Sequence, residues 1–118
     1  MKRSFLQKST LYLRENKKKI LILGATGRLG NYLLNNFNKE IYNLYVNENS
    51  IDLSIFENLE NLITKVKPDI IINTIALTNV NDCEKNIYKA FKSNTEVVKN
   101  LSDIIKNRKK IFFFTNII

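Results

Sequence analysis

The sequence contains no histidine and a single cysteine, Cys83. An internal disulfide cannot form, a zinc site of cysteine and histidine cannot be assembled, and catalysis by an imidazole is excluded. The apolar runs are only four or five residues long, far below the roughly 20 needed to cross a bilayer, and residues 1–19 lack the apolar core of a signal peptide. We therefore expect a cytoplasmic protein with no metal site and no membrane contact.

Acidic residues are scarce relative to basic ones, and the formal net charge is +8. The excess is concentrated in residues 1–19, where seven Lys and Arg accompany one Glu, whereas the rest of the chain is nearly balanced. A basic segment ahead of a balanced domain is typical of a solvated tail, so we expect no nucleic-acid partner. Residues 1–18 have no hydrophobic period and are interpreted as a basic N-terminal extension of uncertain structure.

Strands and helices are expected to alternate after residue 18. Short apolar runs predict five strands: 19–23, 41–46, a short one from Ile51, 69–74 and 111–114. Apolar residues at helical spacing predict helices over 28–37, 56–66 and about 86–106. Ser54 and Glu57 form a capping box for the second helix, and Pro68, the only proline, ends it. The pattern predicts an α/β fold with a Rossmann-like doubly wound parallel sheet in strand order 3-2-1-4-5, truncated after the fifth strand.

All three glycines of the chain, Gly24, Gly27 and Gly30, lie in one G-x-x-G-x-x-G turn between the first strand and the first helix. The first permits a tight turn, the second lets backbone N–H groups approach a diphosphate, and the third allows the helix to pack closely on the strand. The helix N-terminus adds roughly half a positive charge there. A turn that merely needs positive φ is the alternative, but the strand-turn-helix context favours a dinucleotide site.

The glycine spacing resembles that of the extended short-chain dehydrogenase/reductase superfamily. Three later stretches resemble motifs of the dTDP-4-dehydrorhamnose reductase family: residues 51–54 (IDLS), 67–73 (KPDIIIN) and 76–84 (ALTNVNDCE). The family has an asparagine beyond the third stretch, and Asn94 matches it. The resemblance covers residues 19–116 and implies that residues 19–118 are a partial NAD(P)-binding Rossmann domain, the N-terminal part of such a reductase.

The resemblance implies roles for individual residues. The cofactor, NADP or NAD, would contact Gly24, Thr26, Gly27, Arg28, Leu29, Gly30, Asp52, Leu53, Ala76, Leu77 and Thr78. Thr115 would be the catalytic residue whose hydroxyl bonds the substrate carbonyl, and Asn116 would lie beside the substrate. Asn94 would hydrogen-bond backbone near the site, or alternatively within the core. For Asp52 the alternative is a helix-entry residue ahead of Ser54.

The implied function is reduction of a nucleotide-linked 4-keto-6-deoxysugar in dTDP-rhamnose and cell-surface polysaccharide biosynthesis. Its partner would be a small-molecule nucleotide sugar, and formation of a homodimer is left as an open possibility. The second expected strand ends in Val46-Asn47-Glu48 without an acid at its tip, which leaves the choice between NADP and NAD open. The stretch Asn73-Thr74-Ile75-Ala76 is bulkier than the family's N-A-A-A, and Asn116 replaces the family's acid after Thr115.

Reductases of this superfamily protonate the substrate oxygen with a tyrosine that is followed four residues later by a lysine. That pair lies beyond the fifth strand, so we expect this chain to be inactive alone. Tyr88 and Lys92 have the same spacing but precede Thr115, and they are interpreted as a coincidence. The alternatives are a noncatalytic NADP-binding regulatory module, similar to the regulatory subunit of methionine adenosyltransferase, and a nonfunctional gene remnant.

Overall fold

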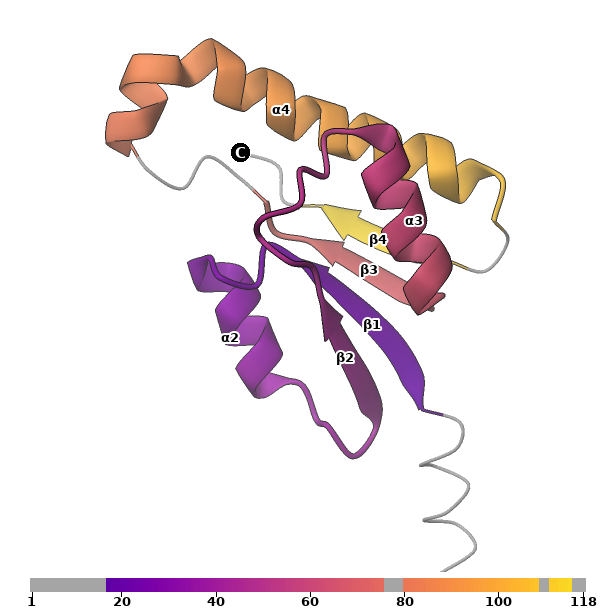
Figure 1. The fold of residues 1–118 in the computed structure, drawn as a ribbon. Helices are drawn as coiled ribbons and strands as arrows, with labels where there is room; N and C mark the ends of the chain where they lie inside the picture. Colours follow the sequence, from indigo (N-terminus) through magenta and orange to yellow (C-terminus); the bar gives the residue numbers. More distant parts are fainter. Residues whose placement is uncertain (1–16, 76–79, 109–110, 116–118) are drawn as a thin grey trace, which may run out of the picture.

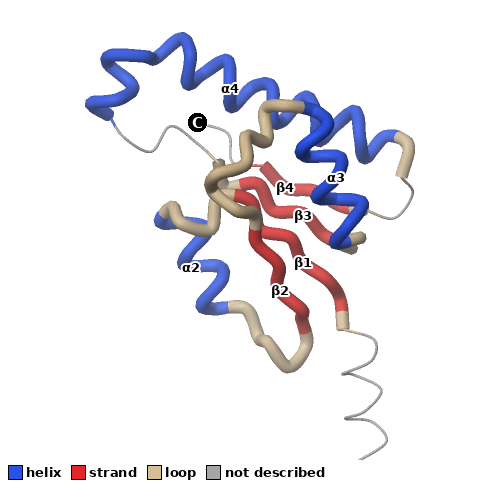
Figure 2. Tube along the Cα trace, viewed as in Figure 1, coloured by secondary structure: helices blue, strands red, loops and turns tan. Residues whose placement is uncertain are grey.

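A computed structural model describes residues 17–75, 80–108 and 111–115, and it describes only the backbone for residues 80–91 and 93. The elements follow in the order β1 (Lys18–Leu23), α2 (Arg28–Asn36), β2 (Tyr42–Val46), α3 (Phe56–Val66), β3 (Ile70–Asn73), α4 (Val80–Lys106) and β4 (Phe112–Thr115). Figure 1 shows one sheet with α2 on one face and α3 and α4 on the other. The same three layers are visible in Figure 2, which confirms the expected α/β architecture.

The sheet is parallel, with strand order β2-β1-β3-β4. In the central strand, Ile20 is aligned with Leu44 of β2 and with Ile70 of β3. After β2 the chain crosses back over β1 to β3, so the winding direction reverses between β1 and β3. This reversal confirms the doubly wound topology and creates a switch point, the place where ligands bind in open α/β sheets.

The strand predicted from Ile51 is wrong, because the described part of the sheet has four strands rather than five. The predicted order 3-2-1-4-5 is corrected accordingly. When its outermost strand, the predicted third one, is removed and the rest are renumbered, it becomes the observed order β2-β1-β3-β4. Residues 51–55 form turns instead, since the N–H of Ile51 donates to Glu48 O (3.2 Å) and that of Ile55 to Asp52 O (3.4 Å). Asp52 Oδ1 also accepts the backbone N–H of Ser54 at 2.9 Å. An aspartate that bonds backbone two residues on closes a turn and competes with strand pairing.

The capping box predicted for α3 is wrong as well. The N-cap residue is Ile55, and no side chain caps the helix. Ser54 Oγ donates to Asp52 Oδ1 at 2.6 Å, so the carboxylate holds the hydroxyl that would have capped the helix. The predicted end of the helix is confirmed: Lys67 follows Val66 in the left-handed conformation (φ 52°, ψ 58°), and Pro68 comes next.

Helix α4 begins at Val80, earlier than the expected start near residue 86. Part of its predicted apolar stripe is confirmed, because Val97, Leu101 and Ile104 are buried. The stripe residues Ile87 and Ala90 lie outside the residues whose side chains are described. β1, β2 and α2 differ from the predicted ranges by one residue at one end, and β3 and β4 differ by one residue at each end.

The main core lies between the sheet and the α3–α4 layer. It contains Leu21, Leu23, Leu53, Leu59, Ile63, Ile71, Val97, Leu101 and Ile104. On the opposite face the alternate residues of β1, Ile20 and Ile22, are buried. Farther from β1 that same face is open, because Phe112 and Phe114 of β4 are 69% and 62% exposed. These two phenylalanines and their half-buried register partners Ile70 and Ile72 are called the open half-face below.

Candidate functional site

The glycine turn connects β1 to α2 at the switch point. Gly24 has φ +83°, a value that favours glycine, and its carbonyl accepts the N–H of Gly27 at 3.0 Å. Gly27 is the N-cap residue of α2, with extended backbone and no side-chain cap. The first N–H groups of α2 therefore have no capping side chain, which leaves them available to hydrogen-bond an anion.

Gly30 allows the close helix–strand contact that the sequence predicted. A Cβ atom at Gly30 would overlap the carbonyl oxygen of Gly24 and lie 2.7 Å from both Ala25 Cα and Thr74 Oγ1. A Cβ at Gly24 would lie 2.9 Å from Thr74 Oγ1. The first and third glycines thus permit tight packing of turn, helix and β3, and this part of the prediction is confirmed.

Thr74 ties the end of β3 to the end of β1. Its hydroxyl donates to the carbonyl oxygen of Leu23 at 2.7 Å and also lies 3.1 Å from that of Gly24. The side chain is buried, at 6% exposure, so these bonds satisfy a hydroxyl that water cannot reach. Thr74, one of the two residues that make this stretch bulkier than N-A-A-A, therefore braces the glycine turn.

The loop after β2 is held against the same turn by two asparagines. Asn47 Oδ1 accepts the backbone N–H of Gly24 at 3.0 Å. The side-chain amide of Asn49 lies 3.3 to 3.4 Å from Thr26 Oγ1. Both asparagines were missed by the sequence interpretation, because only the fold brings residues 23 positions apart together.

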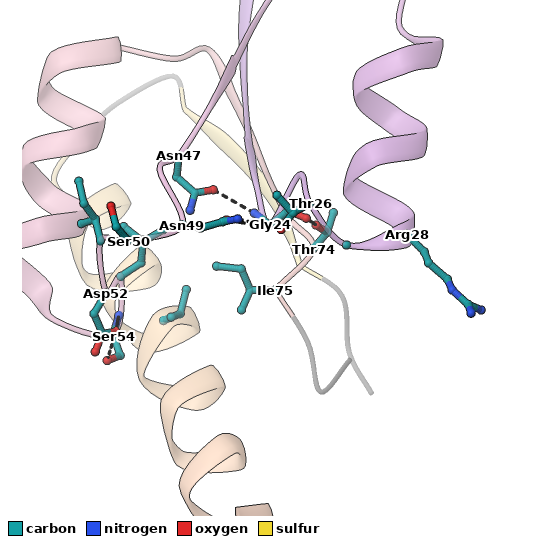
Figure 3. A pocket seen from close by; sticks show the side chains of 14 residues that line it. Gly24, Thr26, Arg28, Asn47, Asn49, Ser50, Asp52, Ser54, Thr74 and Ile75 are labelled. Atoms are coloured by element: carbon teal, nitrogen blue, oxygen red, sulfur yellow. Dashed lines mark hydrogen bonds between the residues drawn. The ribbon is translucent and has the colours of Figure 1, made fainter. Parts of the chain in front are cut away.

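These segments surround a cavity of about 670 Å³ at the carboxyl ends of the strands (Figure 3). This volume is within the range of about 300–1,000 Å³ typical of small-molecule sites. The lining residues are Gly24, Thr26, Gly27, Arg28, Asn47, Asn49, Ser50, Ile51, Asp52, Leu53, Ser54, Thr74, Ile75 and Val97. Among these, Arg28 is the basic side chain and Asp52 the acidic one, and Figure 3 shows Arg28 extending away from the loop of Asn47 and Asp52.

Asp52 serves the turn ahead of α3 as well as the cavity wall. The hydroxyl of Ser54 and, to a smaller extent, its backbone N–H lower the pKa of Asp52 below its usual value, because both donate hydrogen bonds to the carboxylate. The carboxylate is therefore charged at neutral pH. These bonds place Asp52 in the turn ahead of α3, and both of its predicted roles, cofactor contact and helix entry, stay predictions.

Asn100 supports the loop from α4 and was also missed. Its side chain is 5% exposed, and its Nδ2 donates to the carbonyl oxygen of Ser54 at 2.8 Å. The available signal was its position on α4 beside the buried stripe residues Val97 and Leu101. Asn94, the polar residue singled out instead, is half-buried on the same helix.

The predicted site residues are only partly brought together. Six predicted cofactor residues line the cavity: Gly24, Thr26, Gly27, Arg28, Asp52 and Leu53. Leu29 is 46% exposed and outside the lining, and Gly30 packs beneath the turn. Residues 76–78 and Asn116 fall outside the described residues. The binding roles of all these residues stay predictions.

Thr115, the predicted catalytic residue, ends β4 apart from the cavity lining. Its Oγ1 accepts a hydrogen bond of 3.1 Å from Nδ2 of Asn73, which is 1% exposed. Asn73 Oδ1 in turn accepts the N–H of Ile75 at 3.1 Å. Lys92 of the Tyr-x-x-x-Lys match is exposed on α4, and the side chain of Tyr88 is not among those described.

The described ranges contain no group of three or more His, Cys, Asp or Glu side chains placed to hold a metal ion. Within the same ranges, no helix combines the length and apolar character needed to cross a membrane.

A doubly wound parallel sheet with a glycine turn and a cavity at its switch point defines the Rossmann-like class of α/β proteins. Within that class, the chain belongs to the family described as RmlD substrate binding domain, whose family model matches residues 18–115. A comparison with curated protein sequences finds no match.

Similar solved structures include three described as dTDP-4-dehydrorhamnose reductases. The one from Yersinia enterocolitica is 36% identical with a TM-score of 0.63, over 76% of this chain and 32% of that one. The one from Sulfolobus tokodaii, described as hypothetical, is 35% identical with a TM-score of 0.68, over 80% and 38%. The one from Bacillus anthracis, in complex with NADP, is 26% identical with a TM-score of 0.63, over 75% and 33%. The chain therefore spans about a third of the length of these structures.

Proposed function

We propose that the chain binds NADP or NAD and is the cofactor-binding part of a reductase resembling dTDP-4-dehydrorhamnose reductase. One observation carries the proposal: the uncapped N-terminus of α2, beside Gly27, borders a cavity at the switch point of the sheet. A diphosphate there would accept hydrogen bonds from the first N–H groups of α2 and would be stabilised by the positive end of the helix. Membership of the family supports this assignment.

The adenosine half of the cofactor fits the part of the cavity next to β2. Leu53 and Val97 are buried apolar residues of the lining and would pack against a flat base. The charged carboxylate of Asp52 would accept a hydrogen bond from the exocyclic amino group of adenine. The nicotinamide half would then extend across the switch point toward β3 and β4.

In the whole protein, the substrate we propose is a nucleotide-linked 4-keto-6-deoxysugar. When bound, the nicotinamide supplies the hydride that reduces the keto carbon. Thr115 would hold the keto oxygen with its hydroxyl. Because Asn73 Nδ2 donates to Thr115 Oγ1, the hydroxyl proton of Thr115 stays free to donate to the substrate.

The test is calorimetric titration of NADPH and NADH into the chain, with Gly27→Asp as the disrupting variant. An aspartate fits the extended backbone of this N-cap position and would cap the free N–H groups of α2, so the fold is kept while a negative charge faces the diphosphate. We expect at least about a tenfold loss of affinity. The control is Asn38→Asp, beyond the other end of α2, where Asn38 Oδ1 accepts the N–H of Glu40, a bond that aspartate retains. Absence of dinucleotide binding by the wild type, or unchanged binding by Gly27→Asp, would contradict the proposal.

A noncatalytic NADP-binding regulatory module is the second candidate. It is favoured by the composition of the cavity wall, in which Arg28 and Asp52 are the titratable side chains among the described residues and neither is a suitable proton donor at neutral pH. This function predicts cofactor binding without NADPH oxidation when the keto-sugar is added. Measurable oxidation by the chain would exclude it.

A further inference from the structure

A second hollow lies beside the cavity, between β2 and α3. Its volume is about 370 Å³, near the lower end of the range of small-molecule sites. It is lined by residues of β2, of the loop that follows and of α3. Asn47, Ile51 and Leu53 line both spaces, so the loop of residues 47–53 separates the hollow from the cavity. The hollow is therefore a distinct space, with room for a small ligand.

Apolar side chains that the core leaves exposed gather around this hollow. Val46 and Ile51 line it and are 45% and 43% exposed. Leu62 and Val66 of α3, which pack against the main core from its edge, form the other wall. An exposed apolar patch rimmed by polar residues is typical of a ligand-binding groove, whereas apolar residues scattered singly over a surface are not. A ligand with an apolar side chain would bury this surface.

Two opposite charges border the same hollow. Glu48 belongs to the loop after β2 and Lys65 to the last turn of α3, so the carboxylate and the ammonium come from different walls. Both side chains are exposed, and the part of the chain that the structure describes gives neither of them a hydrogen bond or an ion pair. An unpaired carboxylate and an unpaired ammonium around an apolar hollow match a ligand that itself carries one charge of each sign.

From this arrangement we propose that the hollow binds a free α-amino acid with an apolar side chain of about the size of leucine. An α-amino acid is a zwitterion at neutral pH. Its ammonium would pair with the carboxylate of Glu48 and its carboxylate with the ammonium of Lys65, while its side chain packs against the apolar walls. The proposal goes beyond dinucleotide binding and does not depend on it, because Glu48 and Lys65 lie outside the lining of the larger cavity.

The proposal is tested by NMR titration of the full chain with L-leucine. The backbone amide signals of residues 45–48 and 61–66 should shift and reach saturation, because these residues surround the hollow. The signals of α2, none of whose residues line the hollow, should stay in place. The titration therefore measures the affinity and also shows where the ligand binds.

Three analogues each remove one feature of the ligand. Leucine methyl ester lacks the negative charge, N-acetyl-leucine lacks the positive charge, and glycine lacks the apolar side chain. Loss of either charge should weaken binding about three- to tenfold, since Glu48 and Lys65 are exposed and water screens their charges. Loss of the side chain should weaken binding at least about tenfold, because burial of its apolar surface is lost.

Two variants match each charge of the ligand to its partner. Glu48→Gln should weaken the binding of leucine about three- to tenfold but leave that of N-acetyl-leucine unchanged, because N-acetyl-leucine has no ammonium. Lys65→Gln should weaken the binding of leucine equally and leave that of the methyl ester unchanged. Neither residue is packed in the core, so the fold is retained. The controls Glu40→Gln and Lys99→Gln make the same changes at exposed positions outside the hollow and should alter no affinity.

The outcomes decide the proposal. Leucine that binds at the hollow, and loses affinity in each variant as its charges require, supports it. Absence of leucine binding overturns it, and so do methyl ester and N-acetyl-leucine that bind as tightly as leucine, because the two charges then take no part. N-acetyl-leucine amide has the uncharged ends of a residue within a peptide. If it binds more tightly than leucine, the hollow receives a peptide and the proposal of a free amino acid is wrong.

Discussion

The side-chain amide of Asn100 donates a 2.8 Å hydrogen bond to the carbonyl oxygen of Ser54 and so joins α4 to the loop that borders the cavity. The two residues are 46 positions apart in the sequence. Residues Asp52 and Ser54 of that loop line the cavity, and the loop leads directly into α3. The position of the cavity wall therefore depends on one buried amide of α4, whose other buried side chains are apolar in the part of the helix where side chains are described.

Replacing Asn100 with alanine should lower the free energy of unfolding by about 1–3 kcal/mol, because the part-buried hydrogen bond to the carbonyl oxygen of Ser54 would be lost. Urea unfolding followed by circular dichroism measures the effect. The matched variant Asn35→Ala removes an exposed asparagine from α2, where alanine is the better helix former, and should change stability by less than about 0.5 kcal/mol. Equal effects of the two variants would mean that the Asn100 bond contributes nothing.

Gly30→Ala should destabilise the fold by about 1–3 kcal/mol, although alanine is normally preferred in helices. The added Cβ would overlap the carbonyl oxygen of Gly24 and press on Thr74 Oγ1. The shift of the glycine turn should weaken NADPH binding as well. A variant that melts at the wild-type temperature and binds normally would show that the turn has room that the packing does not indicate.

Lys67→Gly should stabilise the protein by roughly 0.5–1 kcal/mol. Lys67 has φ 52° and ψ 58°, a left-handed conformation that costs a residue with a side chain about 1–2 kcal/mol but costs glycine little. The greater conformational freedom of glycine in the unfolded chain offsets part of this gain in stability. Lys65→Gly, within the last turn of α3, makes the same replacement in helical backbone and should destabilise by about 1 kcal/mol. The opposite signs of the two changes are the diagnostic result in thermal or urea unfolding.

Asp52 should make stability fall in acid. The bonds from Ser54 lower the pKa of Asp52 in the folded state, so the carboxylate stabilises the fold above the ordinary value of about 3.9, and this contribution is lost as the pH drops through the lower folded value. The difference in free energy of unfolding between wild type and Asp52→Asn should be constant near neutrality and shrink below about pH 4. A difference that stays the same down to pH 2 would contradict this assignment.

The sequence was sufficient for the parts of the fold that local patterns specify. The buried run of β1, the glycine turn and the apolar spacing of α3 each point to one structure, and the alternation of strands and helices leads to a doubly wound sheet. The cavity beside Gly27 followed from the same turn. These features were predictable because each depends on residues that are neighbours in the chain.

The side-chain bonds that shape the cavity wall were not predictable in the same way. The apolar residue Ile51 favoured a strand, but Asp52 beside it accepts a hydrogen bond from the backbone N–H of Ser54 and forms a turn. A strand would gain little here, because Ile51 is 43% exposed and buries little apolar surface. For Asn47 and Asn100, the partners lie 23 and 46 residues away and are backbone groups of no particular type. The chain is rich in asparagine, and composition does not mark which of these residues will be buried.

The open half-face should bind fluorescent dyes while the protein is still folded. Phe112 and Phe114 present aromatic rings to solvent in the native state, and such a patch attracts the fluorescent dyes that report on melting by binding to apolar surface. Dye fluorescence should therefore be high before any heating, and the increase in fluorescence on unfolding should be small relative to this background. Replacing both phenylalanines with serine should quench the initial fluorescence without moving the transition seen by circular dichroism, because neither ring is packed in the core.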